Sequence, residues 1–189
     1  MMLLNYFGKD RQYHNIQHIA SCLVFAQELM DAYRDQIKHP EELIQAIIWH
    51  DVIYDPQSRT NESDSALQAV YANPNLNHTA LMKIILATRH TGEELNTIEE
   101  KIMVDIDLRG LATETFEEFA ETTRKVRAEY GHLTDLEWER GRSQFYRKML
   151  YHSRIFYTDL FHEKYEESAR NNLRQALSVS LYRLEQQHA

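Results

Sequence analysis

The sequence predicts an all-α protein, and three observations support this fold class. The 189 residues include only 5 glycines and 3 prolines, too few for the many turns of a β-sandwich or barrel. Residues that favour helix, such as Ala, Leu, Glu and Gln, are plentiful. Apolar residues recur mainly at helical spacing, and 43% of the chain is hydrophobic, enough for a sizeable core. Because the length suits one domain and no repeat or linker is evident, we expect a single domain over residues 1–189.

The first two helices are expected before a polar break. Apolar residues from Ile19 to Tyr33 recur at i, i+3 and i+4, which predicts an amphipathic helix over roughly 10–36. Pro40 opens the second helix, since proline is tolerated in a first turn, and this helix runs to about Asp51. The polar stretch DPQSRTNESD that follows is typical of a turn.

Three more helices are expected in the middle of the chain. The third lies near 61–72 and ends before Pro74. The fourth covers about 78–90, with Gly92 as its stop signal. The fifth begins near Asn96 and carries an apolar face.

The pattern T-x-x-E marks helix starts, because the two side chains can satisfy free N–H groups of the first turn as a capping box. It occurs at residues 97–100, 115–118 and 134–137. The last two occurrences predict helices near 115–130 and 134–151. A final helix is expected over about 163–187.

Charge and composition exclude several classes of function. The formal net charge of −8 argues against binding of nucleic acid or of an anionic membrane surface. The only cysteine, Cys22, excludes an intramolecular disulfide and a cysteine-based zinc site. No stretch approaches the ~20 apolar residues of a membrane span, and the start MMLLNYFGKD turns polar too quickly for a signal peptide. We therefore expect a cytoplasmic protein; whether it forms a homodimer is left open.

Polar side chains interrupt the apolar faces of three expected helices. His14 and His18 are four residues apart and share a face at the edge of the first apolar stripe. His50 and Asp51 follow the run IQAIIW and extend its apolar face. Asp107 falls on the otherwise apolar face of the fifth helix. Three helices that are distant along the chain thus each direct His or Asp inward.

Buried ionisable groups cost free energy unless they are paired, and one divalent cation would pair with all of them. We therefore predict a metal site formed by four residues, His18, His50, Asp51 and Asp107. Mixed nitrogen and oxygen ligands with open positions favour Mn, Fe, Co, Ni or Zn over a closed structural zinc site, and Mg is also compatible.

The ordered pattern H…HD…D resembles the HD superfamily of metal-dependent phosphohydrolases. The stretches RQYHNIQHI, WHDVIYD, NESDSA, ATRH and VDIDLRGLA are similar to a bacterial branch of predicted phosphohydrolases, and YEESARNNLRQAL near the C-terminus also fits. The spacings, 32 residues between the two metal-binding histidines and 56 between the two aspartates, are more specific than an HD dipeptide alone. The resemblance implies an HD-domain-like bundle over about 11–111, with extra C-terminal helices over about 114–187.

The resemblance also implies an activity. In the superfamily the first His, the HD pair and the last Asp bind one divalent ion, and these match His18, His50, Asp51 and Asp107. The implied reaction is hydrolysis of a phosphoester of a small molecule, with a nucleotide among the candidates. A divalent ion lowers the pKa of a bound water and polarises a phosphoryl oxygen. Asp51 or Asp107 could also orient that water.

Five further residues are expected near the reacting group. Other superfamily members often carry a glutamate three residues after the HD aspartate, where this sequence has Tyr54. Glu62 is the expected replacement as catalytic acid or base, although a glutamate in a first helical turn can simply favour the helix dipole. His90 is expected to bind a second metal or to donate to the phosphate, unless it only stabilises a helix end. Tyr54, His14 and Arg89 are expected to contact the substrate.

Other functions stay open. A non-catalytic helical module that binds a nucleotide or a metal would account for Tyr54 in place of the frequent glutamate. A diadenosine or cyclic-nucleotide diesterase would fit the same superfamily. The spacing of His14 and His18 also matches the H-x-x-x-H of zinc proteases, but Asn15 stands where that motif needs its glutamate base.

Overall fold

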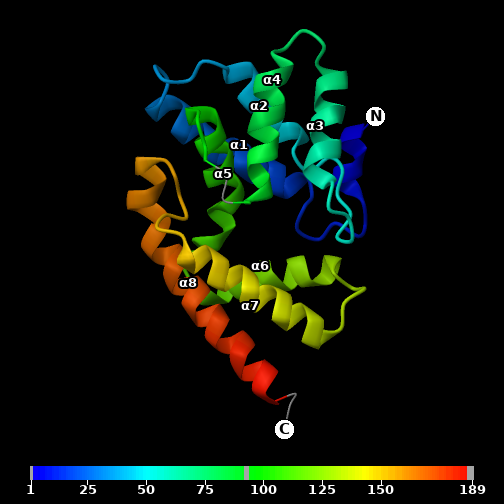
Figure 1. Ribbon diagram of the computed structural model, residues 1–189, viewed down its shortest axis with the longest axis vertical. Coiled ribbons are helices and arrows are strands. Elements are labelled where there is room, and N and C mark those ends of the chain that lie inside the picture. Colours follow the sequence, from blue (N-terminus) through cyan, green and yellow to red (C-terminus); the bar gives the residue numbers. More distant parts are fainter. Residues whose placement is uncertain (1, 92–93, 187–189) are drawn as a thin grey trace. The chain divides into compact units, whose positions relative to one another are not determined.

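The computed structural model describes residues 2–91 and 94–186, and all regular structure within these ranges is helical (Figure 1). Eight α-helices and three short 3₁₀-helices account for it, so the predicted all-α fold is confirmed. Gly92, the expected stop signal of the fourth helix, lies outside the described residues. Within the described ranges, no helix is both long and apolar enough to cross a membrane.

The chain forms two compact units, Met1–Asp107 and Leu108–Ala189. The boundary falls near the end of α5 (Ile98–Leu108), a few residues before the division that the sequence suggested at about 111–114. The expectation of a single domain stays a prediction.

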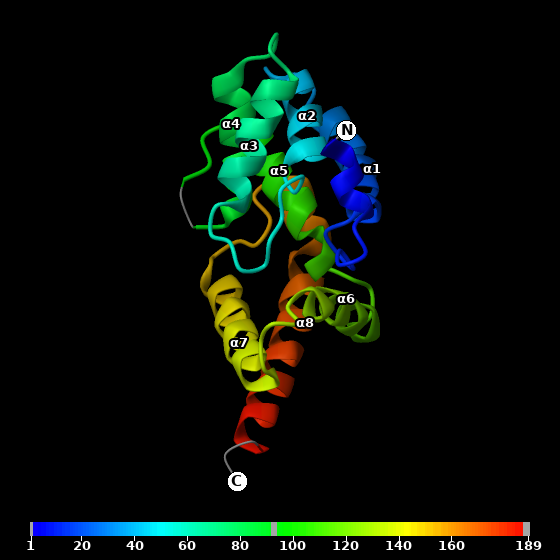
Figure 2. The same cartoon turned by 90° about the vertical axis from the view of Figure 1, so that its right-hand side faces the viewer.

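The first unit contains five α-helices and two short 3₁₀-helices. Their bounds are η1 Met2–Phe7, α1 Ile16–Ala32, α2 Pro40–Trp49, α3 Asn61–Ala72, α4 His78–Leu86, η2 Ala87–Arg89 and α5 Ile98–Leu108. Helices α2, α3 and α4 pack on one another, and α1 packs on α2. Figure 2 shows α5 between α1 and the α3–α4 pair. Apolar residues on the inward faces of these helices, among them Leu29, Leu43, Ile47 and Leu81, are fully buried and form the core.

The predicted first helix is wrong at both ends, since α1 covers Ile16–Ala32 rather than 10–36. Asn15 sets the start as the N-cap: its Oδ1 accepts the N–H of Gln17 at 2.8 Å. Its amide nitrogen also donates to the carbonyl of Arg11 at 3.2 Å. The residue therefore satisfies both a helix end and the loop before it, and this competes with continued helix. The second to fifth helices begin within about two residues of their predicted starts.

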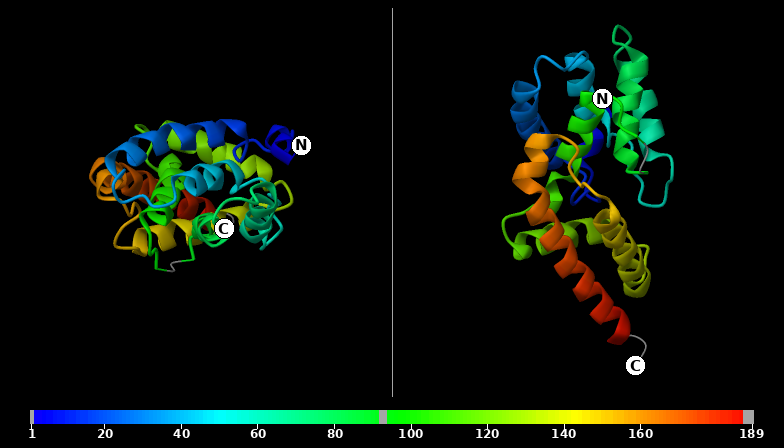
Figure 3. Two further views of the ribbon diagram at one scale, coloured as in Figure 1. Left: turned by 90° about the horizontal axis from the view of Figure 1, so that it is seen from above. Right: turned by 60° about the vertical axis from the view of Figure 1, so that its left-hand side comes forward.

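The second unit consists of η3 Arg109–Leu111, α6 Phe116–Glu129, α7 Asp135–Tyr151 and α8 Asp159–Gln186. Both α6 and α7 pack on α8 (Figure 3). Complete capping boxes start α6 and α7, at Thr115 with Glu118 and at Thr134 with Glu137, as predicted. The final helix begins four residues earlier than expected.

Two helix starts differ from the simple sequence pattern. Thr158 precedes α8, and its Oγ1 accepts the N–H of Phe161 at 3.3 Å, which explains the earlier start. At the third predicted capping box, Thr97 accepts the N–H of Glu100 at 3.2 Å. The Glu100 carboxylate, however, accepts the N–H of Asn96 at 2.7 Å rather than that of Thr97. The threonine half of the predicted capping box is therefore present, but the glutamate binds the N–H one residue earlier than expected.

Buried glutamates in both units accept backbone N–H groups from a neighbouring turn and so fix its position. Glu42, Glu99 and Glu166 are three such residues. Glu99 Oε1 accepts the N–H groups of Lys38 and His39, at 2.6 and 2.9 Å, and so fixes the chain before α2. Glu42 accepts one N–H at 2.8 Å from the turn before α4, and Glu166 accepts two at 3.0–3.1 Å from the segment before α8. Charge-assisted bonds of this kind are stronger than neutral ones.

The same hydrogen bonds determine the pKa of Glu99. Burial by itself raises the pKa of a carboxyl group, but the backbone N–H groups around Glu99 outweigh burial and lower its pKa below the ordinary value of 4.5. The carboxylate therefore stabilises the fold at pH values above the unfolded-state pKa. This contribution is lost as the pH falls through the folded-state pKa.

We predict that Glu99→Gln lowers the free energy of unfolding by about 1 kcal/mol near neutral pH, because the amide accepts the same N–H groups without charge. The difference from the wild type should shrink as the pH falls below about 4. Urea unfolding followed by circular dichroism at several pH values measures it. Glu167→Gln, on the exposed side of α8, is the control and should leave the unfolding free energy unchanged. A Glu99→Gln difference that is independent of pH would contradict the assignment.

Candidate metal centre

Three helices of the first unit bring four side chains to one point. His18 lies in the first turn of α1, His50 and Asp51 follow the last residue of α2, and Asp107 is the penultimate residue of α5. The Nε2 atoms of the two histidines are 3.3 Å apart. His18 Nε2 lies 3.2 Å from Asp107 Oδ1 and 3.7 Å from Asp51 Oδ2. His50 Nε2 lies 3.1 Å from Asp51 Oδ2 and 3.6 Å from Asp107 Oδ1.

His50 is oriented by its own helix. It is the C-cap of α2, and its N–H bonds to Ala46 O. Its ring Nδ1 lies 2.9 Å from Ile47 O, and because a carbonyl only accepts, Nδ1 carries the proton in this contact. A neutral His50 ring therefore presents the lone pair of Nε2 to the cluster. This is the usual arrangement of a histidine that binds a metal.

The cluster is open on its carboxylate side. The side chains of His50 and His18 are 1% and 6% exposed, whereas those of Asp51 and Asp107 are 16% and 17% exposed. Behind His18, Cys22 Sγ lies 3.7 Å from the ring and 3.8 Å from Ile106 O, and burial raises the pKa of this thiol to about 12. Cys22 therefore packs behind the cluster as a neutral group.

The electrostatics follow from packing opposite charges into a buried space. Burial alone lowers the pKa of His50, but the Asp51 carboxylate and the contacts with Asp107 outweigh it and raise the pKa well above 6.5. For Asp51, burial raises the pKa, but the charge of His50 and its close contact outweigh burial and lower it. The pKa of Asp107 is lowered well below its usual value, because hydrogen bonds from His18, His50 and His90 outweigh burial. Without a metal, protonated imidazole balances the carboxylates.

The donor set suits a divalent cation. His18, His50 and Asp107 each offer one ligand atom, and these atoms all lie within 4.8 Å of one another, so the three residues could hold a metal ion. Nitrogen and oxygen ligands lie about 2.0–2.2 Å from such an ion, which places neighbouring ligand atoms roughly 3–3.5 Å apart. The observed spacings of 3.1–3.7 Å are close to that length. Asp51 Oδ2 is buried and has no hydrogen-bond partner among the described residues, as expected of an oxygen that needs a cation.

Arg11 fixes the backbone at the HD pair. Its guanidinium donates to Asp51 O at 2.6 Å, to Val52 O at 3.0 Å and to His14 O at 3.3 Å. It also lies over the ring of Tyr6, 5.3 Å from the centroid. No sequence pattern signals donation to backbone carbonyls, so the sequence does not predict this role. Arg11 joins the loop before α1 to the segment after α2.

His14 and Tyr54, both predicted to contact substrate, lie together. Their rings are stacked, with centroids 4.0 Å apart and an interplanar angle of 25°. His14 precedes α1, so it does not share a helical face with His18 as the i, i+4 spacing suggested, although their ring centroids are 6.1 Å apart. The charge of His14 also lowers the pKa of Asp51, after the larger effects of burial and of His50. Both rings are half-buried beside the HD pair.

Glu62 and Arg89 form a second pair of predicted residues that the structure brings together. Arg89 Nε is 4.0 Å from Glu62 Oε2, and its Nη2 donates to the hydroxyl of Ser63. The sequence motif NESDSA contained Ser63 but gave no reason to select it. His90 follows Arg89 directly, and its Nε2 lies 3.0 Å from Asp107 Oδ2. Arg89 is therefore connected to the His and Asp cluster through its sequence neighbour.

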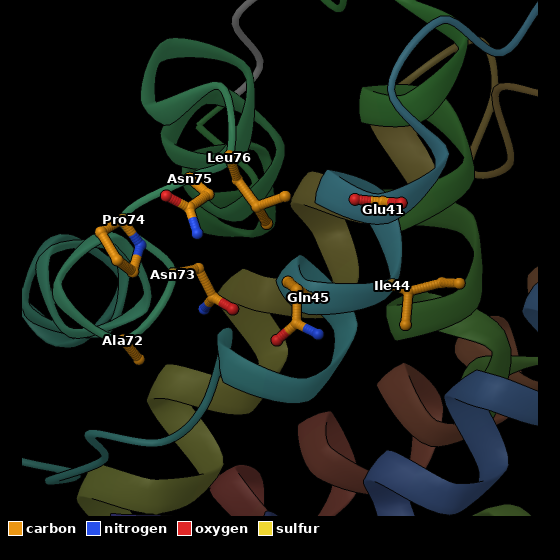
Figure 4. Close-up of a pocket in the computed structure, with 8 residues that line it drawn as sticks. All are labelled: Glu41, Ile44, Gln45, Ala72, Asn73, Pro74, Asn75 and Leu76. Carbon is orange, nitrogen blue, oxygen red and sulfur yellow. The ribbon is translucent and has the colours of Figure 1, made fainter.

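A surface groove of about 450 Å³ lies elsewhere on the first unit (Figure 4). It separates α2 from the turn between α3 and α4, and its lining includes Gln45, Asn73 and Asn75. None of the predicted site residues lines it. Its only ionisable lining residue is Glu41, so the groove offers little chemistry compared with the His and Asp cluster.

Comparison with known proteins does not assign the chain to a family. The chain matched no protein-family model, no curated protein and no solved structure. The functional argument therefore depends on the site itself.

We predict that a divalent metal stabilises the folded protein. At roughly 100 times the dissociation constant, binding should contribute about 2.7 kcal/mol, which raises the melting temperature by roughly 5–10 °C for a chain of this size. Calorimetry of chelator-treated protein with Mn²⁺, Co²⁺, Ni²⁺, Zn²⁺ or Mg²⁺ tests this. Asp107→Asn should remove most of the rise, and Asp35→Asn, at an exposed position, should keep it. An equal rise in wild type and Asp107→Asn would place the metal elsewhere.

We also predict that Arg11→Lys weakens metal binding by about tenfold, because lysine lacks the planar guanidinium whose two terminal nitrogens donate to Asp51 O and Val52 O, and Asp51 is then less firmly held. Stability should fall by about 1–3 kcal/mol. Titration calorimetry with Co²⁺ and urea unfolding measure the two effects. Arg34→Lys, at an exposed ion pair with Asp31, should change neither quantity. Unaltered Co²⁺ affinity in a destabilised Arg11→Lys protein would limit Arg11 to folding.

Proposed function

We propose that this protein is a metal-dependent phosphohydrolase that acts on a small phosphorylated molecule, with a nucleotide among the candidates. One observation carries the proposal: two buried histidines and two partly exposed aspartates from three helices converge with ligand-like spacing. The same residues, in the same order along the chain, produce the resemblance to the HD superfamily. Convergence in space and order in sequence point to the same four residues, and together they favour this function.

We propose His18, His50, Asp51 and Asp107 as the ligands of one divalent ion. The first two supply imidazole nitrogen and the other two carboxylate oxygen, a mixture that suits Mn, Fe, Co, Ni, Zn or Mg. The imidazoles are buried and the carboxylates face the more open side, so free coordination positions would point away from the core. An ion bound there supplies an activated water near neutral pH and polarises a phosphoryl oxygen.

The surrounding residues have distinct proposed tasks. Glu62 is the proposed general acid or base, and its carboxylate is held 4.0 Å from Arg89 Nε. Arg89, with a half-exposed guanidinium, is the proposed phosphate contact. The stacked pair His14–Tyr54 is the proposed wall against which the rest of the substrate packs. Tyr54 replaces the glutamate frequent in the superfamily, so Glu62 takes the ionisable role.

We predict that the metal-loaded protein releases phosphate or a phosphomonoester from one or more members of a panel of mono- and diesters. Asp51→Asn should lower kcat/KM by at least about 10²-fold through loss of a ligand that also orients water. Glu62→Gln should lower kcat by about 10²–10⁴-fold with metal affinity unchanged, as for loss of an acid or base. Asp35→Asn, exposed and distant in sequence, is the control.

The same assay distinguishes a phosphohydrolase from a non-catalytic binding module. That alternative stays possible because Tyr54 stands where other superfamily members often have a glutamate. If phosphate esters raise the melting temperature of the metal-loaded protein but no ester is hydrolysed with any metal, the chain binds without catalysis. Turnover that persists in Asp51→Asn and Glu62→Gln would contradict the assigned roles. Turnover of diesters but not of monoesters would identify the diesterase variant of the same chemistry.

A further inference from the structure

His90 has an unusual backbone conformation. Its φ of 49° and ψ of 38° place it in the left-handed region, and among the described residues it is the only non-glycine residue with positive φ. This conformation costs a residue with a Cβ roughly 1 kcal/mol and is normally occupied by Gly or Asn. Strain of this kind persists when a site requires it. The local hydrogen bond of His90 N–H to Ala87 O closes η2 and would be available to glycine as well.

With this backbone conformation the imidazole of His90 contacts one oxygen of Asp107. His90 Nε2 lies 3.0 Å from Oδ2 of Asp107, while Oδ1 of the same carboxylate faces His18 Nε2 at 3.2 Å. The two oxygens of Asp107 are thus used for different partners. One points into the cluster, and the other is held from outside by a ring that is 19% exposed.

We propose that His90 is a positioning residue that sets the orientation of Asp107 for metal binding, rather than a ligand or a catalytic acid. His90 Nε2 contacts Oδ2 of Asp107, whereas Oδ1 is the oxygen that lies beside both His18 and His50, so His90 approaches the carboxylate from outside the cluster. A donor on the outer oxygen fixes the carboxylate plane, and donors of this kind typically change metal affinity by 10–100-fold. The inference rests on the proposed metal site but is independent of the reaction.

The test uses the fact that glycine suits the backbone of residue 90 better than histidine does. His90→Gly removes the ring and its contact with Asp107 but relieves the backbone strain, so the two effects oppose each other and the metal-free variant should melt close to wild type. Its affinity for Co²⁺, measured by titration calorimetry, should nevertheless fall by about 10–100-fold. His90→Asn, which also tolerates the left-handed region, should behave in the same way. His132→Asn, at an exposed position, is the control and should change neither quantity.

A second measurement separates positioning from ligation. X-ray absorption of the Co²⁺-loaded proteins should count two imidazole ligands in wild type and also two in His90→Gly. Three in wild type and two in the variant would make His90 a ligand and overturn the inference. Equal Co²⁺ affinity in wild type and both variants would also overturn it. If the wild type bound no divalent metal, the proposed function and this inference would fall together, whereas a wild type that binds metal without turnover would leave His90 testable as described.

Discussion

Ionisable groups that are expensive to bury meet at one point in the first unit, and the arrangement of its helices depends on this meeting. Each of α1, α2 and α5 carries part of the set at or near one of its ends. Alone, any of these side chains would cost several kcal/mol in the core. Together, imidazoles and carboxylates balance one another through protons, and a divalent cation would balance them better. The raised pKa of His50 and the lowered pKa of Asp107 both result from this pairing of opposite charges.

Each member of the cluster is oriented by a contact outside it. The backbone carbonyl of Ile47 holds the ring of His50, and Arg11 holds the peptide of Asp51. Asn15 fixes the turn of α1 that carries His18. Asp107 has His90 on its outer oxygen. Metal sites generally need such support, since ligand atoms must be placed to within a fraction of an ångström. The four supports come from loops and helix ends.

Helical periodicity predicted most of the helices. Their starts were predictable where a local signal marks them, as at Pro40 and at the capping boxes of Thr115 and Thr134. The start of α1 could not be predicted in this way, since the bonds of the Asn15 side chain compete with a pattern that looks helical. The ordered His and Asp residues predicted which side chains meet. The role of Arg11 was not predictable, because its partners are backbone carbonyls brought near by tertiary structure. Nothing in the local sequence signals a left-handed histidine.

The buried glutamates have a consequence for how this fold tolerates change. Glu42, Glu99 and Glu166 bind turns through main-chain N–H groups, and every amino acid except proline supplies such a group. The position of each turn is therefore determined by one glutamate in a helix and not by the side chains of the turn itself. Connecting segments are then free to drift in composition without loss of register, while a substitution at the distant acid would release a whole loop.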